Sequence, residues 1–306
     1  MIYFTTHTMQ HILSTLQKLL LAQNHVDFTV LNPDTYDTYA GTPINIASNT
    51  YLYRSYKTWS DLAELLHCKM CTPKIIDEHL IQITFTKLKT DSFHSESKNN
   101  EKYGINSHFA QIYKMEEPAF LYYYQQALKN VTVEKRTDIL NLGVNRADEF
   151  QIIKNQVDTH QYQKLNFTGI DHSKTAINEA KQRFPEQNMT FYTSDINDMD
   201  SLELGHFDLL ISISTLQSPS INFKPFFMHL VQNYLKKDSA IILGFPNSRW
   251  IGGEMVYGAK APNYAMSEMS ILLNDVIFCK KYLQQKKYRV TITGKHYLFL
   301  TATKIH

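Results

Sequence analysis

Short apolar runs and helically spaced apolar residues alternate along the C-terminal two thirds of this chain. The run Ile139–Leu142 ends at Gly143, and the run Phe167–Ile170 ends at Asp171. Apolar residues then recur every three or four positions, at Phe150, Ile153 and Val157 after the first run and at Ile177, Ala180 and Phe184 after the second. A four-residue apolar run is typical of a buried strand, and the spacing after it predicts a helix. The pattern predicts two consecutive strand–turn–helix units.

The same alternation continues to the end of the chain. Apolar runs predict strands at 189–192, 206–213 and 240–244, and helical spacing predicts helices over 227–234 and 269–282. Runs that are apolar at nearly every position indicate a sheet covered on both faces. Residues 288–304 predict two strands joined by a turn at Gly294, a connection too short for a parallel pair. We therefore expect an α/β fold with a doubly wound, mostly parallel sheet and a C-terminal antiparallel hairpin.

The N-terminal third has a different pattern. A helical stripe lies within residues 12–20, Val26–Leu31 and Leu80–Leu88 have the pattern of strands, and Thr58 with Asp61 has the form of a capping box. Together these predict a smaller α+β region. Residues 89–104 are polar with almost no apolar anchor, which predicts a linker or a mobile lid. We expect residues 1–105 to form a substrate-binding or cap region and residues 106–306 to form the main domain.

The turn at Gly143 and the carboxylate of Asp171 are expected to face one crevice. In an open parallel sheet, ligands bind outside the carboxyl ends of the strands. A glycine turn lets the backbone approach a ligand closely, and a carboxylate can accept hydrogen bonds from two ribose hydroxyls. These residues predict a site for a nucleoside cofactor.

Composition and net charge narrow the partners, the location and the metal sites expected of the protein. The chain has 306 residues with a formal net charge of +2, which gives no support to nucleic acid or an anionic membrane as partner. Three cysteines argue against a disulfide framework, and no apolar run is long enough to span a membrane, so a cytoplasmic location is expected. His67, Cys68 and Cys71 have no second pair of metal ligands, so buried thiols are favoured and no metal is expected.

The motif at the first turn distinguishes between two kinds of cofactor. A dinucleotide site is expected to have Gly-x-Gly-x-x-Gly, but the three positions hold Gly143, Asn145 and Asp148. The order of elements over residues 110–306, with its terminal hairpin, instead resembles the class I S-adenosylmethionine-dependent methyltransferases. The resemblance implies a seven-stranded sheet and S-adenosylmethionine as cofactor.

The family's motifs can be carried over to this sequence residue by residue. The glycine-rich first motif matches Asn141–Ala147, and the acidic residue after the second strand, which holds the ribose, matches Asp171. The acidic residue after the third strand, which contacts adenine, matches Asp195, and the fourth-strand motif lies on Phe207–Ser214. The resemblance thus implies a set of cofactor contacts, namely Asn141, Gly143, Asn145, Asp171, His172, Asp195, Ile196 and Ser212.

Three residues depart from the commonest first motif. Asn141 replaces the acidic residue, and Asn145 and Ala147 replace glycines. Asn tolerates positive φ and Ala is small, so the turn can still form. The replacement of the acidic residue removes the usual carboxylate near the amino group of the cofactor.

Methyl transfer from a sulfonium is an in-line displacement, so alignment of the nucleophile and exclusion of water carry much of the catalysis. The polar, aromatic segment 244–258 follows the fifth strand and is the expected acceptor pocket. Its candidate catalytic residues are Arg249, Glu254 and Tyr257, although Arg249 and Glu254 could equally form an ion pair that only shapes the loop. Tyr113 is left open between the core and a cofactor contact.

The function expected from the resemblance is methyl transfer to an acceptor that the sequence does not identify, with a small molecule favoured. Two alternatives remain. One is a methyltransferase acting on RNA or protein, suggested by the cluster Lys280, Lys281, Lys286, Lys287 and Arg289. The other is a non-catalytic nucleoside-binding module, suggested by the altered first motif. The sequence predicts no oligomeric state.

Overall fold

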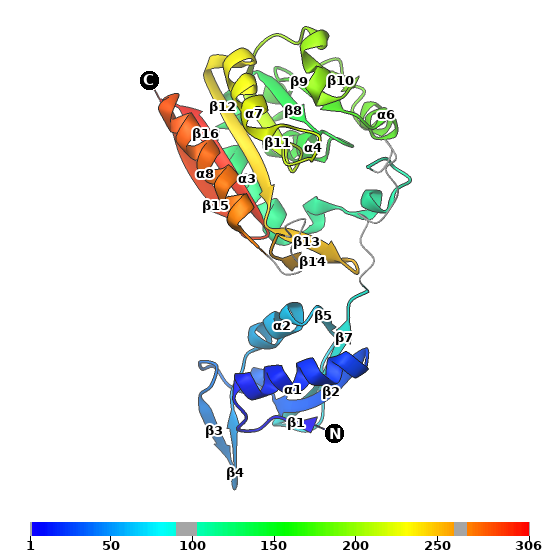
Figure 1. The fold of residues 1–306 in the computed structure, drawn as a ribbon, viewed down its shortest axis with the longest axis vertical. Helices are drawn as coiled ribbons and strands as arrows, with labels where there is room; N and C mark the ends of the chain where they lie inside the picture. The colour runs from blue at the N-terminus through cyan, green and yellow to red at the C-terminus, as the bar shows by residue number, and fades with distance from the viewer. Residues whose placement is uncertain (1, 90–102, 260–267, 306) are drawn as a thin grey trace. The chain divides into compact units, whose positions relative to one another are not determined.

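The computed structural model of the protein describes residues 2–89, 103–259 and 268–305. The expected linker or lid, residues 89–104, lies almost entirely outside these ranges. The chain forms two compact units, which are described separately (Figure 1). Unit 1 comprises Met1–Ser92 with Trp250–Tyr257, and unit 2 comprises Phe93–Arg249 with Gly258–His306. The division expected from the sequence was linear, whereas a short segment late in the chain packs with the N-terminal unit.

Unit 2 is built on a seven-stranded sheet with the order β10-β9-β8-β11-β12-β16-β15. Its strands are β8 (Asp138–Leu142), β9 (Asn166–Asp171), β10 (Met189–Thr193), β11 (Phe207–Ile213), β12 (Leu235–Pro246), β15 (Tyr288–Gly294) and β16 (Tyr297–Lys304). The first five strands in the order are parallel, and β16 is antiparallel to both β12 and β15. This arrangement confirms the predicted fold class.

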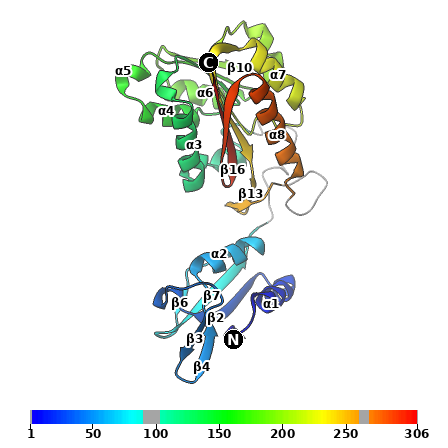
Figure 2. The same cartoon turned by 90° about the vertical axis from the view of Figure 1, so that its left-hand side faces the viewer.

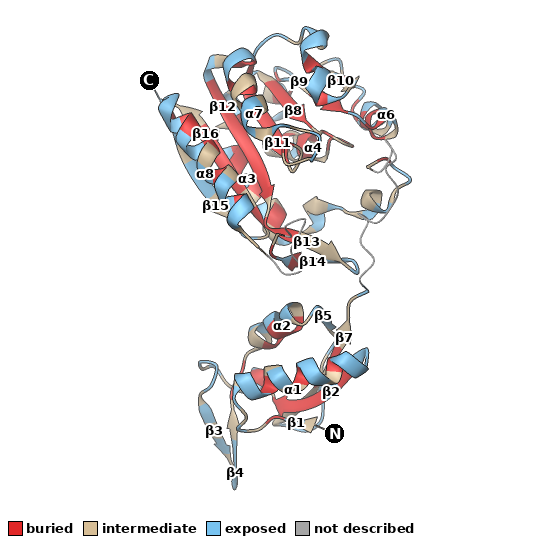
Figure 3. Cartoon of the chain, viewed as in Figure 1, coloured by how far each residue is buried: buried red, intermediate tan, exposed pale blue. Residues whose placement is uncertain are grey.

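Helices cover both faces of this sheet. They are α3 (Pro118–Asn130), α4 (Asp148–Gln156), α5 (Thr159–Tyr162), α6 (Lys174–Arg183), α7 (Phe223–Asn233) and α8 (Ser270–Gln285), with the 3-10 segments η3 (His108–Gln111), η4 (Lys114–Glu116), η5 (Val133–Lys135) and η6 (Ile196–Leu202). Figure 2 shows α3 and α4 on one side of the sheet and α7 and α8 on the other. Because both faces are covered, β8, β11 and β12 are buried along most of their length (Figure 3).

The central strand β8 lies between β9 and β11, where the strand order reverses direction. In register, Leu142 pairs with Ile170 of β9 and with Ser212 of β11. Connections from these strands therefore run to opposite sides, and in open parallel sheets ligands bind at such a point, outside the carboxyl ends of the strands. The candidate site lies at this point.

The structure corrects two local predictions. Helix α2 (Tyr56–Leu65) begins earlier than the predicted capping box, because Ser55 Oγ accepts the Thr58 N–H and caps the helix. The segment predicted as a loop after the fifth strand contains a hairpin of β13 (Ser248–Ile251) and β14 (Glu254–Tyr257).

Unit 1 contains a five-stranded sheet with its own core. Its strands are β1 (Ile2–Tyr3), β2 (His25–Leu31), β5 (Cys68–Met70), β6 (Lys74–Ile75) and β7 (Leu80–Lys87), its helices are α1 (Met9–Ala22), α2 and the short η1 (Pro33–Thr35), and a separate hairpin pairs β3 (Pro43–Ile46) with β4 (Asn49–Leu52). Alternate residues of β2 and β7 point into the core, where Phe28 packs against Trp59 and Phe85.

Asp208, near the start of β11, fixes the start of β8. Its carboxylate accepts the Thr137 N–H at 2.9 Å, the Asp138 N–H at 3.0 Å and the Thr137 hydroxyl at 2.7 Å. We expect Asp208→Ala to lower the free energy of unfolding by about 2 kcal/mol, because two backbone donors lose a charged acceptor. Asp208→Asn retains one oxygen and should lose less. Urea denaturation measures both, and equal losses would contradict this role of the carboxylate.

Candidate functional site

The turn between β8 and α4 requires glycine at position 143. Gly143 has φ +72°, and a Cβ built there would lie 1.9 Å from Thr215 Oγ1. Its N–H donates to Ile170 O at 2.8 Å, which ties the turn to β9. A side chain at this position would meet both an unfavourable backbone region and a steric clash. The Thr215 side chain therefore occupies the space where a side chain at position 143 would stand.

The two other altered motif positions adopt the backbone that the turn needs. Asn145 has φ +45° and Ala147 has φ +62°. The Asn145 N–H donates to Asp171 Oδ2 at 3.0 Å, and its Nδ2 donates to the Tyr103 carbonyl at 2.9 Å. The turn can thus form without the second and third glycines, as predicted.

Asp171 lies at the end of β9, directly beside this turn. Besides the bond from Asn145, its Oδ1 accepts the Ser173 N–H at 2.9 Å, and His172 Nδ1 lies 3.6 Å from the same oxygen. Ser173 in turn caps α6, since its Oγ accepts the Ala176 N–H. Asp171 is only 5% exposed. These bonds bring Gly143, Asn145, Asp171 and His172 together.

Asp195 and Ile196 follow the neighbouring strand β10. The Ser194 N–H donates to Asp171 O at 3.0 Å, so the ends of β9 and β10 are joined. Asp195 caps η6, because its Oδ1 accepts both the backbone N–H and the side-chain amide of Asn197 at 2.9 Å. Ile196 is buried. Asp195 therefore has a structural role in addition to the predicted contact with adenine.

On the other side of β8, β11 carries the predicted contact Ser212 and leads to Thr215, which the sequence did not single out. Ser212 is buried in the strand, with its Oγ 3.5 Å from Leu142 O. Ser214 has φ +64°, and the next residue, Thr215, lies against Gly143. Thr215 is thus the residue of this strand end that contacts the turn. The contact depends on chain reversal at Ser214, which no apolar pattern predicts.

Residues 103–114, which we call the strap, lie over the turn and the start of α6. The Ile105 N–H donates to Thr175 Oγ1 at 3.2 Å, and the Tyr103 ring packs edge-on against His172 at 5.9 Å between centroids. A cavity of about 520 Å³ is lined mostly by strap residues, together with Arg146 and Glu179.

Arg146 holds the strap at its other end. Its Nη1 donates to Ala110 O and to the Tyr113 hydroxyl, both at 3.2 Å, and its guanidinium carbon lies 4.5 Å from the centre of the Tyr113 ring. Tyr113, which the sequence left open, is therefore a partner of Arg146.

Two buried polar side chains lie beneath the turn. Asn141, on β8, is 1% exposed, and Glu149, in the first turn of α4, is 8% exposed. Burial raises the pKa of Glu149 to about 7, with Asp148 adding to the rise and with Lys114 and the Asn141 amide acting against it. The Tyr124 hydroxyl donates to Glu149 O at 3.3 Å. Sequence reasoning missed Glu149 because its helical position predicts an ordinary first-turn carboxylate.

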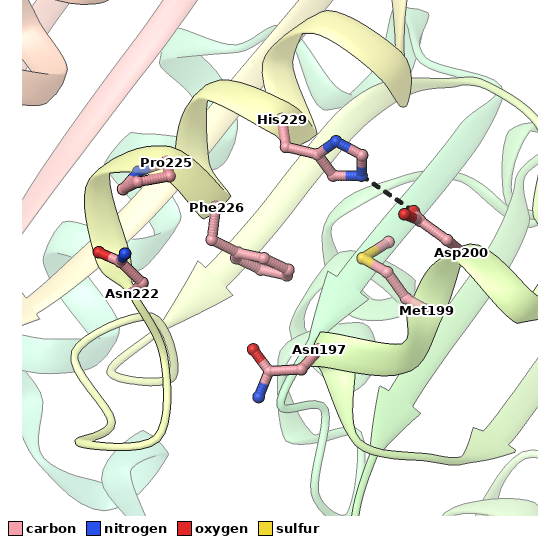
Figure 4. Close-up of a pocket in the computed structure, with 7 residues that line it drawn as sticks. All are labelled: Asn197, Met199, Asp200, Asn222, Pro225, Phe226 and His229. Atoms are coloured by element: carbon pink, nitrogen blue, oxygen red, sulfur yellow. Dashed lines mark hydrogen bonds and ion pairs between the residues drawn. The ribbon is translucent and has the colours of Figure 1, made fainter.

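A second cavity of about 320 Å³ lies between η6 and α7 (Figure 4). Phe226 and Met199 point toward it, and His229 Nε2 lies 2.9 Å from Asp200 Oδ1 at its edge. Hydrogen bonds from Tyr234 and His229 lower the pKa of Asp200. None of the predicted cofactor contacts lines this cavity.

The three candidate catalytic residues are divided between the units. Arg249 belongs to unit 2, whereas Glu254 and Tyr257 belong to unit 1. Within unit 1, the Tyr257 N–H donates to the Glu64 carboxylate, and a Cβ on Gly252 would lie 2.9 Å from the Lys89 N. The hairpin thus packs against α2 and the end of β7. All three residues remain candidates.

Across residues 2–89, 103–259 and 268–305, no three His, Cys, Asp or Glu side chains lie close enough together to hold a metal ion. Cys68 is buried, and Cys71 Sγ lies 3.5 Å from the Thr86 hydroxyl. Among the described helices, none combines the length and apolar character needed to cross a bilayer.

We expect Gly143→Ala to destabilise the protein by about 2–4 kcal/mol, because it adds a clash with Thr215 to the cost of positive φ. Gly205→Ala is the matched control, since Gly205 has φ +80° but nothing within 4 Å of the added Cβ. It should cost about 1 kcal/mol. Chemical denaturation measures both. Adding Thr215→Ala to Gly143→Ala should recover part of the lost stability. Equal destabilisation by Gly143→Ala and Gly205→Ala would exclude the clash.

The titration of Glu149 predicts a pH dependence of stability. Its pKa is about 7 in the folded protein and near 4.5 when unfolded, so the folded state binds more protons between these values. The free energy of unfolding should therefore fall as pH rises through this window, by about 3 kcal/mol in all. Denaturation between pH 4 and 8 should show the fall in the wild type and not in Glu149→Gln. Asp148→Asn, one position earlier, should retain it, and a retained fall in Glu149→Gln would contradict the assignment.

The comparisons with known proteins agree with this geometry. The family described as "Methyltransferase domain" matches residues 125–292, more than half of the chain. No curated protein matches the sequence.

Solved methyltransferase structures are more distantly similar. The plantazolicin methyltransferase BpumL, in complex with a pentazolic desmethylPZN analog and SAH, is 14% identical with a TM-score of 0.47, over 68% of this chain and 95% of that one. The N-methyltransferase NodS from Bradyrhizobium japonicum WM9, in complex with S-adenosyl-L-homocysteine, is 14% identical with a TM-score of 0.43, over 63% and 92%. The CurJ carbon methyltransferase is 13% identical with a TM-score of 0.43, over 68% and 57%. Similarity at this distance carries no information about an acceptor.

The family match runs from within α3 to within β15 and includes the turn at Gly143 and Asp171. The chain therefore belongs to the methyltransferase domain family, and its strand order and motifs are those of a class I S-adenosylmethionine-dependent methyltransferase.

Proposed function

We propose that this S-adenosylmethionine-dependent methyltransferase acts on a small-molecule acceptor and holds its cofactor in the crevice between the turn at Gly143 and Asp171. The observation that carries the cofactor site is the hydrogen bond from the Asn145 N–H to Asp171 Oδ2. This bond places the backbone of the turn beside an oriented carboxylate, and the sugar of a nucleoside cofactor can bind to such a pair.

The proposed contacts follow from this placement. Asp171 accepts the ribose hydroxyls, while Asp195 and Ile196, at the end of the adjacent strand, take the adenine. Gly143 lets the cofactor come close to the protein backbone of the turn, and Thr215 packs against this glycine. Because Asp171 is nearly closed to solvent, Tyr103 and its neighbours in the strap must shift when the cofactor enters.

The chemistry that such a site supplies is alignment. The sulfonium already carries the charge that drives displacement, so the enzyme mainly holds donor and acceptor in line and excludes water. Strong activation of the nucleophile is needed only for acceptors that must lose a proton. Arg249, Glu254 and Tyr257 are the proposed acceptor-side groups, and unit 1, which contains the last two, is the proposed source of acceptor selection.

A small-molecule acceptor is favoured by charge. Binding to nucleic acid depends on neutralising phosphates, and the net charge of +2 provides no general excess of positive charge. The basic cluster at the end of α8 and the start of β15 is exposed, and the Lys286 Nζ lies 5.7 Å from the centre of the Tyr282 ring. An RNA or protein substrate remains the second candidate because of this cluster.

The direct test is calorimetry with S-adenosylmethionine and S-adenosylhomocysteine. We expect Asp171→Ala to weaken binding of both at least about tenfold, since a charged acceptor for two hydroxyls is lost. Asp171→Asn retains one acceptor oxygen and controls for the structural role of this side chain. Absence of binding by the wild type would refute the cofactor site.

The acceptor class is tested by transfer of a labelled methyl group. The wild type is incubated separately with mixed small phenols, amines and thiols, with total RNA, and with a protein extract. Label in the small-molecule fraction supports the proposal. Label only in RNA or protein overturns the small-molecule assignment, and cofactor binding without any label favours the non-catalytic alternative.

A further inference from the structure

The cavity between η6 and α7 is used neither by the predicted cofactor contacts nor by the candidate catalytic residues. It has a volume of about 320 Å³, and it is lined by residues of η6 and by residues of α7 and its N-terminal cap (Figure 4). This volume is at the small end of the range for sites that bind small organic molecules. The cavity is therefore a candidate for a second ligand site.

One side of this cavity is apolar. Figure 4 shows the Phe226 ring extending from α7 toward Met199 of η6. Met199 is buried, and Phe226 is half-buried. An aromatic ring packs well against another ring and against a thioether, so these two side chains suit the apolar body of a ligand.

The edge of the cavity carries an oriented carboxylate. Asp200 Oδ1 accepts hydrogen bonds from the Tyr234 hydroxyl and from His229 Nε2, the latter at 2.9 Å. Because a carboxylate oxygen only accepts, His229 Nε2 must carry a proton, and Asn233 Nδ2 lies 2.8 Å from His229 Nδ1. No other described residue donates to Asp200 Oδ2, and this side chain is 66% exposed. One carboxylate oxygen is thus fixed by the protein and the other is open to a ligand.

The charge around the cavity is negative. Residues 195–203 contain four carboxylates and no Lys or Arg. Among the described residues that line the cavity, none is a Lys or an Arg. Lys224 of α7 lies instead against α8, with its Nζ 5.4 Å from the centre of the Phe278 ring. The cavity is therefore complementary to a positively charged ligand.

We propose that the cavity between η6 and α7 binds a small organic cation, whose ammonium or amidinium group contacts Asp200 and whose apolar body packs on Phe226 and Met199. This site is separate from the proposed cofactor crevice and does not depend on it. The competing explanation is structural: the contacts of Asp200 with His229 and Tyr234 only hold η6 against α7. The two explanations differ in whether a free organic cation binds at this position.

The test uses the full chain with methyl-labelled methionine and benzylammonium as the probe. Benzyl alcohol and benzoate are the matched neutral and anionic probes. Nuclear magnetic resonance follows the Met199 methyl signal, which Met199→Leu identifies. We expect benzylammonium to shift this signal saturably and to leave the Met70 signal of unit 1 unchanged. The two other probes should bind at least about fivefold more weakly, because neither can form a charge-assisted bond to a carboxylate.

Matched substitutions separate the charge from the fold. Asp200→Asn should weaken benzylammonium about fivefold or more, because its oxygen still accepts from Tyr234 and His229 while the charge is lost. Asp198→Asn removes an exposed charge of the same segment that does not line the cavity, and it should stay within about twofold. Phe226→Leu keeps the charge and should weaken the probe about threefold, since the aromatic face is lost.

Several outcomes would overturn the proposal. They are the absence of a saturable Met199 shift, equal binding of the three probes, and equal weakening by Asp200→Asn and Asp198→Asn. The titration is repeated with saturating S-adenosylhomocysteine. A retained shift supports a separate site, whereas a lost shift means that the cation binds in the cofactor crevice and overturns the assignment. Wild-type protein that binds benzylammonium but not S-adenosylhomocysteine refutes only the proposed cofactor site.

Discussion

The hydrogen bond between the Asn145 N–H and Asp171 Oδ2 is the contact on which the candidate site depends. It joins the ends of two adjacent parallel strands, and the turn after β8 that carries its donor has positive φ at Gly143 and Asn145. The parallel register of β8 with β9 brings those ends level, and Thr215 fills the space that a side chain at position 143 would need. The turn is therefore specified by packing from both neighbouring strands.

Two carboxylates near this bond, those of Asp171 and Glu149, lie in different surroundings. Asp171 is oriented by two backbone donors, whereas Glu149 is buried without a cation at bonding distance among the described residues. The two carboxylates near this turn thus have different environments, and burial raises the pKa of Glu149 to about 7. The strap is linked to this region by the hydrogen bond from Asn145 Nδ2 to Tyr103 O, and Lys114 interacts electrostatically with Glu149.

The division of the chain separates the proposed acceptor-side residues. β12 is the last parallel strand of the unit 2 sheet, and the hairpin that follows begins in unit 2 and continues as part of unit 1. Two of the three candidate acceptor-side residues are therefore packed with α2 and β7, so that sequence changes in the core of unit 1 can alter them. This supports a role for unit 1 in acceptor choice, within the proposed function.

The sequence alone determined the order of strands and helices, the terminal hairpin, the glycine turn and the acidic residue beside it. These features are readable because burial imposes a period on apolar residues and because positive φ restricts residue type. Only the tertiary structure decided that Thr215 backs the turn, that Tyr103 and Tyr113 belong to the strap, and that Glu149 is buried. It also decided that the segment around Glu254 folds as a hairpin with the N-terminal unit. Such contacts join residues far apart in the sequence and leave no periodic trace in it, so they become visible only when the chain is folded.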